Sequence, residues 1–235
     1  MGKYKIADFI VEFSPKYNNL KSFSALFEYN GCRAADFVLN VTEEHLKSLY
    51  AKMSDGTTIE QAEEFAYANL FNKSIIKHNA MLVHSSAIVY DSEAYLFAGR
   101  SGIGKSTHTN LWRQAFGNKV SILNDDKPVV RIYDDYCVAF GTPFDGGSGI
   151  ANNLSAPLKA VIFIERGEEN AIRKADYNEI ISNLYQSTAH HLSKPSAMAM
   201  LDNFDRLIPK CKFYILKCNT DISAAYTAFN TLISE

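Results

Sequence analysis

The chain has 235 residues, 47% of them hydrophobic and 21% charged, a balance that predicts a packed globule with one sizeable α/β domain. The formal net charge of −2 and the scattered lysines and arginines argue against a nucleic-acid partner. Because no apolar run approaches ~20 residues and no signal peptide is evident, we expect a cytoplasmic protein without a membrane partner.

Residues 1–80 are expected to form a small amino-terminal α+β layer. Thr58, with Gln61 three residues later, fits a capping box at the start of a helix that reaches about Lys77. The strand-like runs before it are residues 6–13, 23–29 and 37–41. No linker rich in proline or glycine follows this layer, so we expect residues 1–235 to form a single domain with a core at 81–235.

The pattern from residue 81 onward alternates between strands and helices, which indicates a mixed α/β core. The expected strands are residues 82–89, 94–98, 120–123, 129–133, 136–140, 158–164 and 213–216. Helices are expected after Ser106 as far as Gly117, at 180–188, at 197–207, and after the capping residue Asp221.

The segment Gly99-Arg-Ser-Gly-Ile-Gly-Lys-Ser106 fits the phosphate-loop pattern Gly-x-x-x-x-Gly-Lys-Ser/Thr in full. Its glycines allow successive amides to point at one anion, Lys105 can reach the β- and γ-phosphates, and the Ser106 hydroxyl can bind Mg²⁺. The alternative is an ordinary glycine-rich turn before a helix. We expect ATP to contact Gly99, Arg100, Ser101, Gly102, Ile103, Gly104, Lys105, Ser106 and Thr107.

Asp125 and Asp126 end an apolar run twenty positions after Lys105. Such carboxylates can bind Mg²⁺, and one of them can accept a proton from an attacking hydroxyl. A solvated Asp-Asp turn is the alternative, and alternation along a strand means that the two side chains need not face one site. His84 stands in an otherwise apolar strand, where a histidine is more often a core residue than a ligand.

The segments His84-Ser-Ser-Ala, Gly99…Lys105-Ser106 and Asn124-Asp125-Asp126 together resemble the nucleotide core of HPr kinase/phosphorylases and ATP-dependent phosphoenolpyruvate carboxykinases. The resemblance implies a mixed-sheet phosphate-loop fold of that type. It also implies that Asp125 is the catalytic base or a metal carboxylate, that Asp126 and Ser106 bind metal, and that His84 and Lys105 belong to the active site. It is specific over about residues 81–130, and the oxaloacetate-binding arginines of the carboxykinases are not recognisable.

Other candidates stay open at this stage. The segment 141–149 is either a loop that closes over the acceptor, with Asp145 or Ser148 touching it, or a simple connection. Further cations for the transition state are Arg100, Arg131, Arg166 and Arg173. His190 and His191 are interpreted as helix C-terminal partners.

The sequence therefore predicts an ATP- and Mg²⁺-dependent phosphotransferase. Its acceptor would be a hydroxyl of a peptide, a small protein or a small molecule. The alternative is a regulatory or accessory protein that binds ATP without transferring phosphate. The oligomeric state stays open, a homo-oligomer included.

Overall fold

The computed structural model describes residues 1–188 and 192–234, so the predicted role of His190 and His191 lies outside the described residues. The strands are β1 (Gly2–Ile6), β2 (Phe9–Phe13), β3 (Phe37–Val38), β4 (Ala80–Leu82), β5 (Ser85–Tyr90), β6 (Glu93–Ala98), β7 (Val120–Asn124), β8 (Val129–Ile132), β9 (Cys137–Phe140), β10 (Ser155–Arg166), β11 (Ala171–Lys174) and β12 (Lys212–Cys218). The helices are α1 (Asn18–Ser24), α2 (Glu43–Tyr50), α3 (Ile59–Ile75), α4 (Lys105–Phe116), α5 (Tyr177–Thr188), α6 (Lys194–Leu207) and α7 (Ser223–Ser234). The expected mixed α/β class is confirmed.

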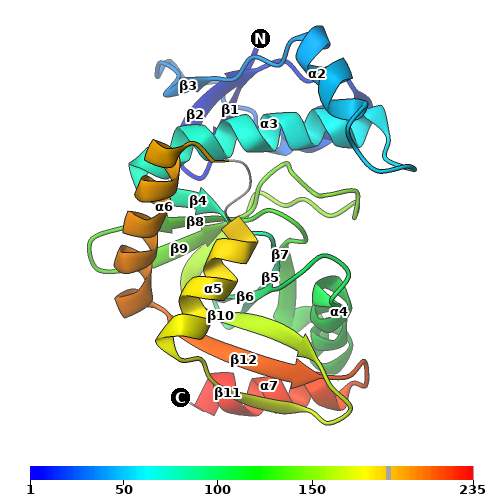
Figure 1. Ribbon diagram of the computed structural model, residues 1–235, viewed down its shortest axis with the longest axis vertical. Coiled ribbons are helices and arrows are strands. Elements are labelled where there is room, and N and C mark those ends of the chain that lie inside the picture. Colours follow the sequence, from blue (N-terminus) through cyan, green and yellow to red (C-terminus); the bar gives the residue numbers. More distant parts are fainter. Residues whose placement is uncertain (189–191, 235) are drawn as a thin grey trace.

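The amino-terminal layer lies at one end of the molecule and combines β1, β2 and β3 with α1, α2 and α3 (Figure 1). The predicted strand 6–13 is split, because Ala7 and Asp8 both have positive φ and turn the chain into an antiparallel hairpin. The capping box of Thr58 and Gln61 is confirmed at the start of α3.

The strand predicted at residues 23–29 is wrong. This segment completes α1 and continues as a 3₁₀ turn over Ala25–Phe27. Leu20, Ser24 and Phe27 are all buried, and their spacing of four and three residues is the period of a helix rather than of a strand. The aromatic side chains of the segment suggested a strand, but burial of the helical stripe decides the conformation.

The main sheet brings three strand ends to one edge. Strands β6, β10 and β12 are parallel neighbours, while β5 is antiparallel to both β6 and β7. Strand β7 therefore runs in the same direction as β6. The carboxyl ends of β6 and β7 consequently meet the amino end of β5, and in open α/β sheets such an edge is where ligands bind.

Helices cover both faces of this sheet because each central strand alternates its apolar side chains. In β6, Leu96 and Ala98 pack in one cluster with residues of α5 and α6, whereas Tyr95 and Phe97 pack in another with α4 and α7. The same alternation continues in β10 and β12. The result is a three-layer core, visible in Figure 1.

A third apolar cluster joins the amino-terminal layer to this core. Phe71 and Ile75 of α3 pack in one cluster with Leu82, Val129 and Phe144. The buried contacts thus continue from the small β1–β3 sheet into β4 and β8. The amino-terminal layer is thereby packed against the part of the chain that holds the end of β7.

The predicted strand 82–89 is interrupted at Val83 and His84. The Val83 amide donates to the Pro128 carbonyl (3.0 Å) and the His84 amide to the Ser187 carbonyl (2.8 Å), so the chain passes from β4 to β5 without a continuous ladder. This interruption places His84 at the sheet edge rather than inside a strand.

Within 1–188 and 192–234, no helix has the length and apolarity that crossing a bilayer requires. The four cysteines are free: Cys137 and Cys218 are buried, Cys211 is half-buried and Cys32 is exposed.

Candidate functional site

The phosphate-loop segment connects β6 to α4, which is the strand–loop–helix context that the motif requires. Gly102 and Gly104 have φ values of 72° and 117°, and a Cβ added to either would meet no described atom within 4 Å. The backbone conformation, not lack of space, therefore requires glycine at these two positions.

Lys105 lies under the loop with 7% of its surface exposed, and its Nζ donates to the carbonyls of Gly99 and Arg100, both at 3.3 Å. Burial lowers the pKa of Lys105, while the charges of Asp126 and Asp125 act in the opposite direction. The ammonium group is thus held by two long hydrogen bonds to carbonyl oxygens, and the carboxylates of Asp125 and Asp126 are near enough to affect its pKa. A bound phosphate could replace those contacts.

Asp125 is connected to the loop helix through two hydroxyl groups. Ser86, the second residue of β5, donates to Asp125 Oδ1, and its hydroxyl lies 2.8 Å from that of Thr109. Because each hydroxyl carries one hydrogen and that of Ser86 goes to Asp125, Thr109 is the donor in its contact with Ser86, and the Ser106 carbonyl, 3.1 Å from the Thr109 hydroxyl, is the alternative acceptor. This chain fixes the Asp125 carboxylate relative to the first turn of α4.

Asp126 lies between two basic side chains. Its Oδ1 is 3.3 Å from His84 Nε2, and its Oδ2 accepts a hydrogen bond from Lys127. Burial alone would raise the pKa of Asp126, but these two partners outweigh it and lower the pKa to about 2. Asp126 is therefore ionised at neutral pH, and the two carboxylates differ in surroundings: Asp125 faces hydroxyl groups, whereas Asp126 faces the nitrogen atoms of His84 and Lys127.

Asn124 holds the turn that carries both carboxylates. Its side chain is fully buried, and its Oδ1 accepts from the amides of Asp126 (2.9 Å) and Lys127 (2.7 Å). Its Nδ2 donates to the carbonyls of Thr142 (3.0 Å) and Phe144 (3.2 Å). The end of β7 is thereby fixed to the segment that follows β9.

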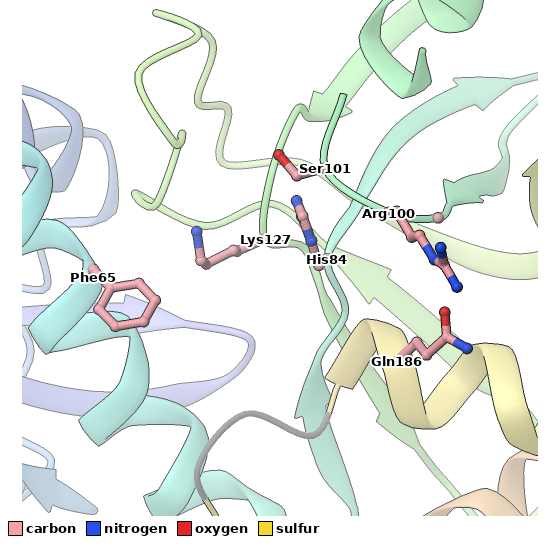
Figure 2. A pocket seen from close by; sticks show the side chains of 7 residues that line it. Phe65, His84, Arg100, Ser101, Lys127 and Gln186 are labelled. Carbon is pink, nitrogen blue, oxygen red and sulfur yellow. The ribbon is translucent and has the colours of Figure 1, made fainter. Parts of the chain in front are cut away.

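A cavity of about 430 Å³ opens in front of the loop, between α3 and α5. In Figure 2, His84 projects into its middle, with Phe65 and Lys127 on one side and Arg100 and Gln186 on the other. A cavity of this size can hold a small molecule or a side chain of a larger partner. The lining residues are Phe65, His84, Gly99, Arg100, Ser101, Lys127 and Gln186.

A second cavity of about 330 Å³ lies on the other flank of the loop. It extends from the loop and the first turn of α4 to the ends of β10 and β12. Its lining residues are Gly102, Ile103, Gly104, Thr107, His108, Ile164, Arg166, Gly167, Cys218, Asn219 and Thr220. The loop thus separates two cavities.

The structure gathers most of the predicted site residues at this one edge. His84, Lys105, Asp125 and Asp126 lie there, and Ser106 follows Lys105 in the first turn of α4. Sequence reasoning missed Ser86, which lies inside the quoted His-Ser-Ser-Ala segment, and it missed Lys127, although it follows the Asp pair directly. Both residues lie within or next to a quoted motif, and that position was the signal by which the Ser86 hydroxyl and the Lys127 ammonium group could have been found.

The contacts of the candidate arginines show which of them lie near the phosphate loop. Arg131 donates to the Ala7 carbonyl and stacks over Phe9, and Arg173 is paired with Glu179, so neither faces the loop. Arg100 lines the first cavity, and Arg166 lines the second while donating to the Gly102 carbonyl at 2.5 Å.

The contacts of Asp145 bear on whether residues 141–149 close over an acceptor or form a simple connection. Its carboxylate is 1% exposed and accepts from the Gly149 amide at 2.6 Å and from Asn19 at 3.2 Å. Ser148 accepts from the Ile150 amide on the surface. Asp145 therefore anchors the segment and does not line either cavity.

The residues present fit a magnesium ion that arrives with a nucleotide. Among the described residues no group of three or more His, Cys, Asp or Glu side chains could hold a metal by itself. Mg²⁺ commonly takes one or two carboxylates and completes its octahedron with phosphate oxygens and water. One hydroxyl, Ser106, and the two carboxylates Asp125 and Asp126 match that need.

Comparisons with known proteins assign the chain to no family. No family model matches the chain, and no curated protein matches it. Among solved structures, one match is the HPr(Ser) kinase/phosphatase from Coxiella burnetii, with a TM-score of 0.38 and 11% identity over 65% of this chain and 97% of that one. Such a distant likeness carries no argument about activity, which must come from the site itself.

Proposed function

We propose that the chain is an ATP- and Mg²⁺-dependent phosphotransferase of the HPr-kinase-like group that phosphorylates a hydroxyl. The observation that carries this proposal is the hydrogen-bond chain from Thr109 of α4 through Ser86 to Asp125, which joins a carboxylate to the phosphate-loop helix. Binding of a nucleotide alone requires the loop but no ordered carboxylate beside it. Transfer to a hydroxyl requires both.

The positions of the two cavities suggest the orientation in which the nucleotide would bind. Amides at the start of α4 would bind the phosphates, with Thr107 nearest the α-phosphate end. Because Thr107 lines the second cavity, the nucleoside is assigned to that side. The γ-phosphate then lies by Lys105, towards the first cavity, which we assign to the acceptor.

The chain's own residues supply the chemistry of the transfer. An acceptor hydroxyl in the first cavity would give its proton to Asp125 as it attacks the γ-phosphorus in line with the departing ADP oxygen. Lys105 would balance negative charge on the transferred group, and ionised Asp126 would keep His84 and Lys127 in place. When bound, Mg²⁺ would neutralise charge on the β- and γ-phosphates, held by Ser106 and by Asp125 or Asp126.

The test incubates the protein with Mg²⁺, ATP and a panel of serine-containing peptides and hydroxy compounds, and follows phosphate transfer by ³¹P NMR. Lys105→Ala is expected to lose ATP binding. Asp125→Asn is expected to retain ATP binding and to lose at least about 100-fold in turnover, as for a general base. Lys119→Ala, which removes the same charge from an exposed site outside both cavities, is the matched control.

Two results would decide against the proposal. If Lys105→Ala binds ATP as tightly as the unaltered chain, the loop does not bind phosphate. If the unaltered chain binds ATP but consumes none with any acceptor, the protein binds nucleotide without transferring its phosphate, as a regulatory protein would.

A further inference from the structure

His108 carries a buried hydrogen-bond donor that has no partner among the described residues. The side chain lies in the first turns of α4, is 2% exposed, and packs against the Phe97 ring with centroids 4.7 Å apart. Its Nδ1 atom makes no hydrogen bond within the described residues. Buried polar atoms are almost always hydrogen-bonded, so this donor needs a partner that the described residues do not supply.

Trp112 determines which nitrogen of His108 carries the hydrogen. The indole Nε1–H of Trp112 donates to His108 Nε2 at 3.1 Å, so Nε2 must be the unprotonated acceptor. A neutral imidazole whose Nε2 accepts carries its single hydrogen on Nδ1.

His108 is one of the residues that line the second cavity. His108 lines that cavity together with Thr107, the preceding residue, whose amide lies at the phosphate-binding end of the helix. The other end of the cavity is formed by Asn219 and Thr220, after β12. A group that contacts His108 is therefore one step beyond the phosphates, towards the nucleoside.

We infer that His108 is a positioning residue for the nucleotide, whose Nδ1–H donates to an acceptor atom of the nucleoside, while Trp112 fixes the ring in the donating form. This inference rests on the proposed function, because it takes the phosphates to lie on the loop. It adds a recognition element for the sugar or base that the phosphate-loop motif does not contain.

Two substitutions separate the two hydrogen bonds of the ring. The side-chain nitrogen of Asn takes the place of an imidazole Nδ1, and the side-chain end of Gln takes the place of Nε2. His108→Asn therefore keeps a donor for the nucleoside and leaves the Trp112 N–H without its acceptor. His108→Gln keeps an acceptor for Trp112 and loses the donor.

The experiment measures binding of ATP and of tripolyphosphate, both with Mg²⁺, by calorimetry. His108→Gln is expected to weaken ATP binding about tenfold and to leave tripolyphosphate binding unchanged, because one buried hydrogen bond is lost. His108→Asn is expected to bind ATP within about threefold of the unaltered chain and to melt at a lower temperature, because buried Trp112 is left unpaired.

A spectroscopic readout tests the donor directly in the unaltered protein. In ¹H–¹⁵N spectra of the imidazole rings, the His108 Nδ1–H signal is expected to be present without ligand, to move when ATP is added and to stay in place with tripolyphosphate.

Three outcomes would overturn the inference. They are an unchanged ATP affinity in His108→Gln, an equal loss for ATP and tripolyphosphate, and an Nδ1–H signal that ignores ATP. If the unaltered chain binds neither ligand, the proposed function itself fails and the role of His108 fails with it.

Discussion

Glu64 joins α3 to the segment beside Asp126, and its protonation is predicted to control stability near neutral pH. The side chain is 2% exposed, and its Oε1 accepts from the Gly146 amide at 2.7 Å. A Cβ on Gly146 would lie 2.5 Å from Asp126 Cγ, so this amide is packed against the candidate site. Burial raises the pKa of Glu64 to about 8; Asp145 adds to this effect and the Gly146 amide opposes it.

The direction of the pH effect follows from these values. Since the folded-state pKa is raised above the ordinary 4.5, stability from protonated Glu64 is fully present below about pH 4.5 and is lost as the pH rises towards about 8. Over this window the folded chain holds one extra proton, which at about 1.4 kcal/mol per pH unit amounts to about 5 kcal/mol. Glu64→Gln, which stays neutral, should avoid this loss.

The assay is urea unfolding of both proteins at intervals from pH 5 to pH 8. The free energy of unfolding of Glu64→Gln minus that of the unaltered chain is expected to increase by several kcal/mol across the range. Asp145→Asn should reduce the pH dependence in part, because it removes the neighbouring carboxylate.

Glu179→Gln is the control for this series. A hydrogen bond from Arg173 lowers the pKa of Glu179 to about 2, so this residue acts outside the measured window and its variant should keep the full slope. A difference between Glu64→Gln and the unaltered chain that stays constant from pH 5 to pH 8 would refute the reasoning, since it would mean that Glu64 is charged throughout.

Three further substitutions test the site. Asp126→Asn should lower the free energy of unfolding by about 2.5 kcal/mol at pH 7. The loss should shrink as the pH falls from about 4 towards 2, because the lowered pKa of Asp126 stabilises only the ionised form. A loss that urea unfolding finds independent of pH would contradict this. Ser86→Ala should lower kcat about tenfold with an unchanged ATP Kd, because Asp125 loses its orienting donor; equal loss in both would indicate general damage. Asn124→Ala should destabilise the fold by about 3 kcal/mol in thermal unfolding, and a cost under 1 kcal/mol would show that water replaces its amide.

The sequence predicted those elements whose conformation is determined by residues close to one another along the chain. The strand, glycine loop and helix around Lys105 were predicted because the loop's residue types prescribe its backbone. The Thr58 cap was predicted because its partner Gln61 is three residues away. Helix α2 has a similar signal in Thr42, which accepts from the His45 amide, but it was not predicted.

Elements that depend on distant partners could not be predicted in this way. The break at Val83 and His84 depends on carbonyls of Pro128 and Ser187, which lie far along the chain. Strand β11 is short and largely exposed, and within the described chain it pairs only with β12. At the site, the motif indicated Asp125 and Asp126 but not their different surroundings, because Ser86 and His84 are brought to them by the antiparallel arrangement of β5 and β7, and the turn after β7 decides that the adjacent Lys127 contacts Asp126.

Strand β10 has a consequence for how the molecule opens. Its first residues, Ser155 to Pro157, pair with β9, and its later residues pair with β6 and β12. The β4–β8–β9 ladder and the loop-bearing ladder therefore share one continuous backbone, and separating them breaks the pairing of β9 with Ser155–Pro157 of β10. Native-state hydrogen exchange should accordingly find a single cooperative unit, with amides at both ends of β10 protected to the same free energy.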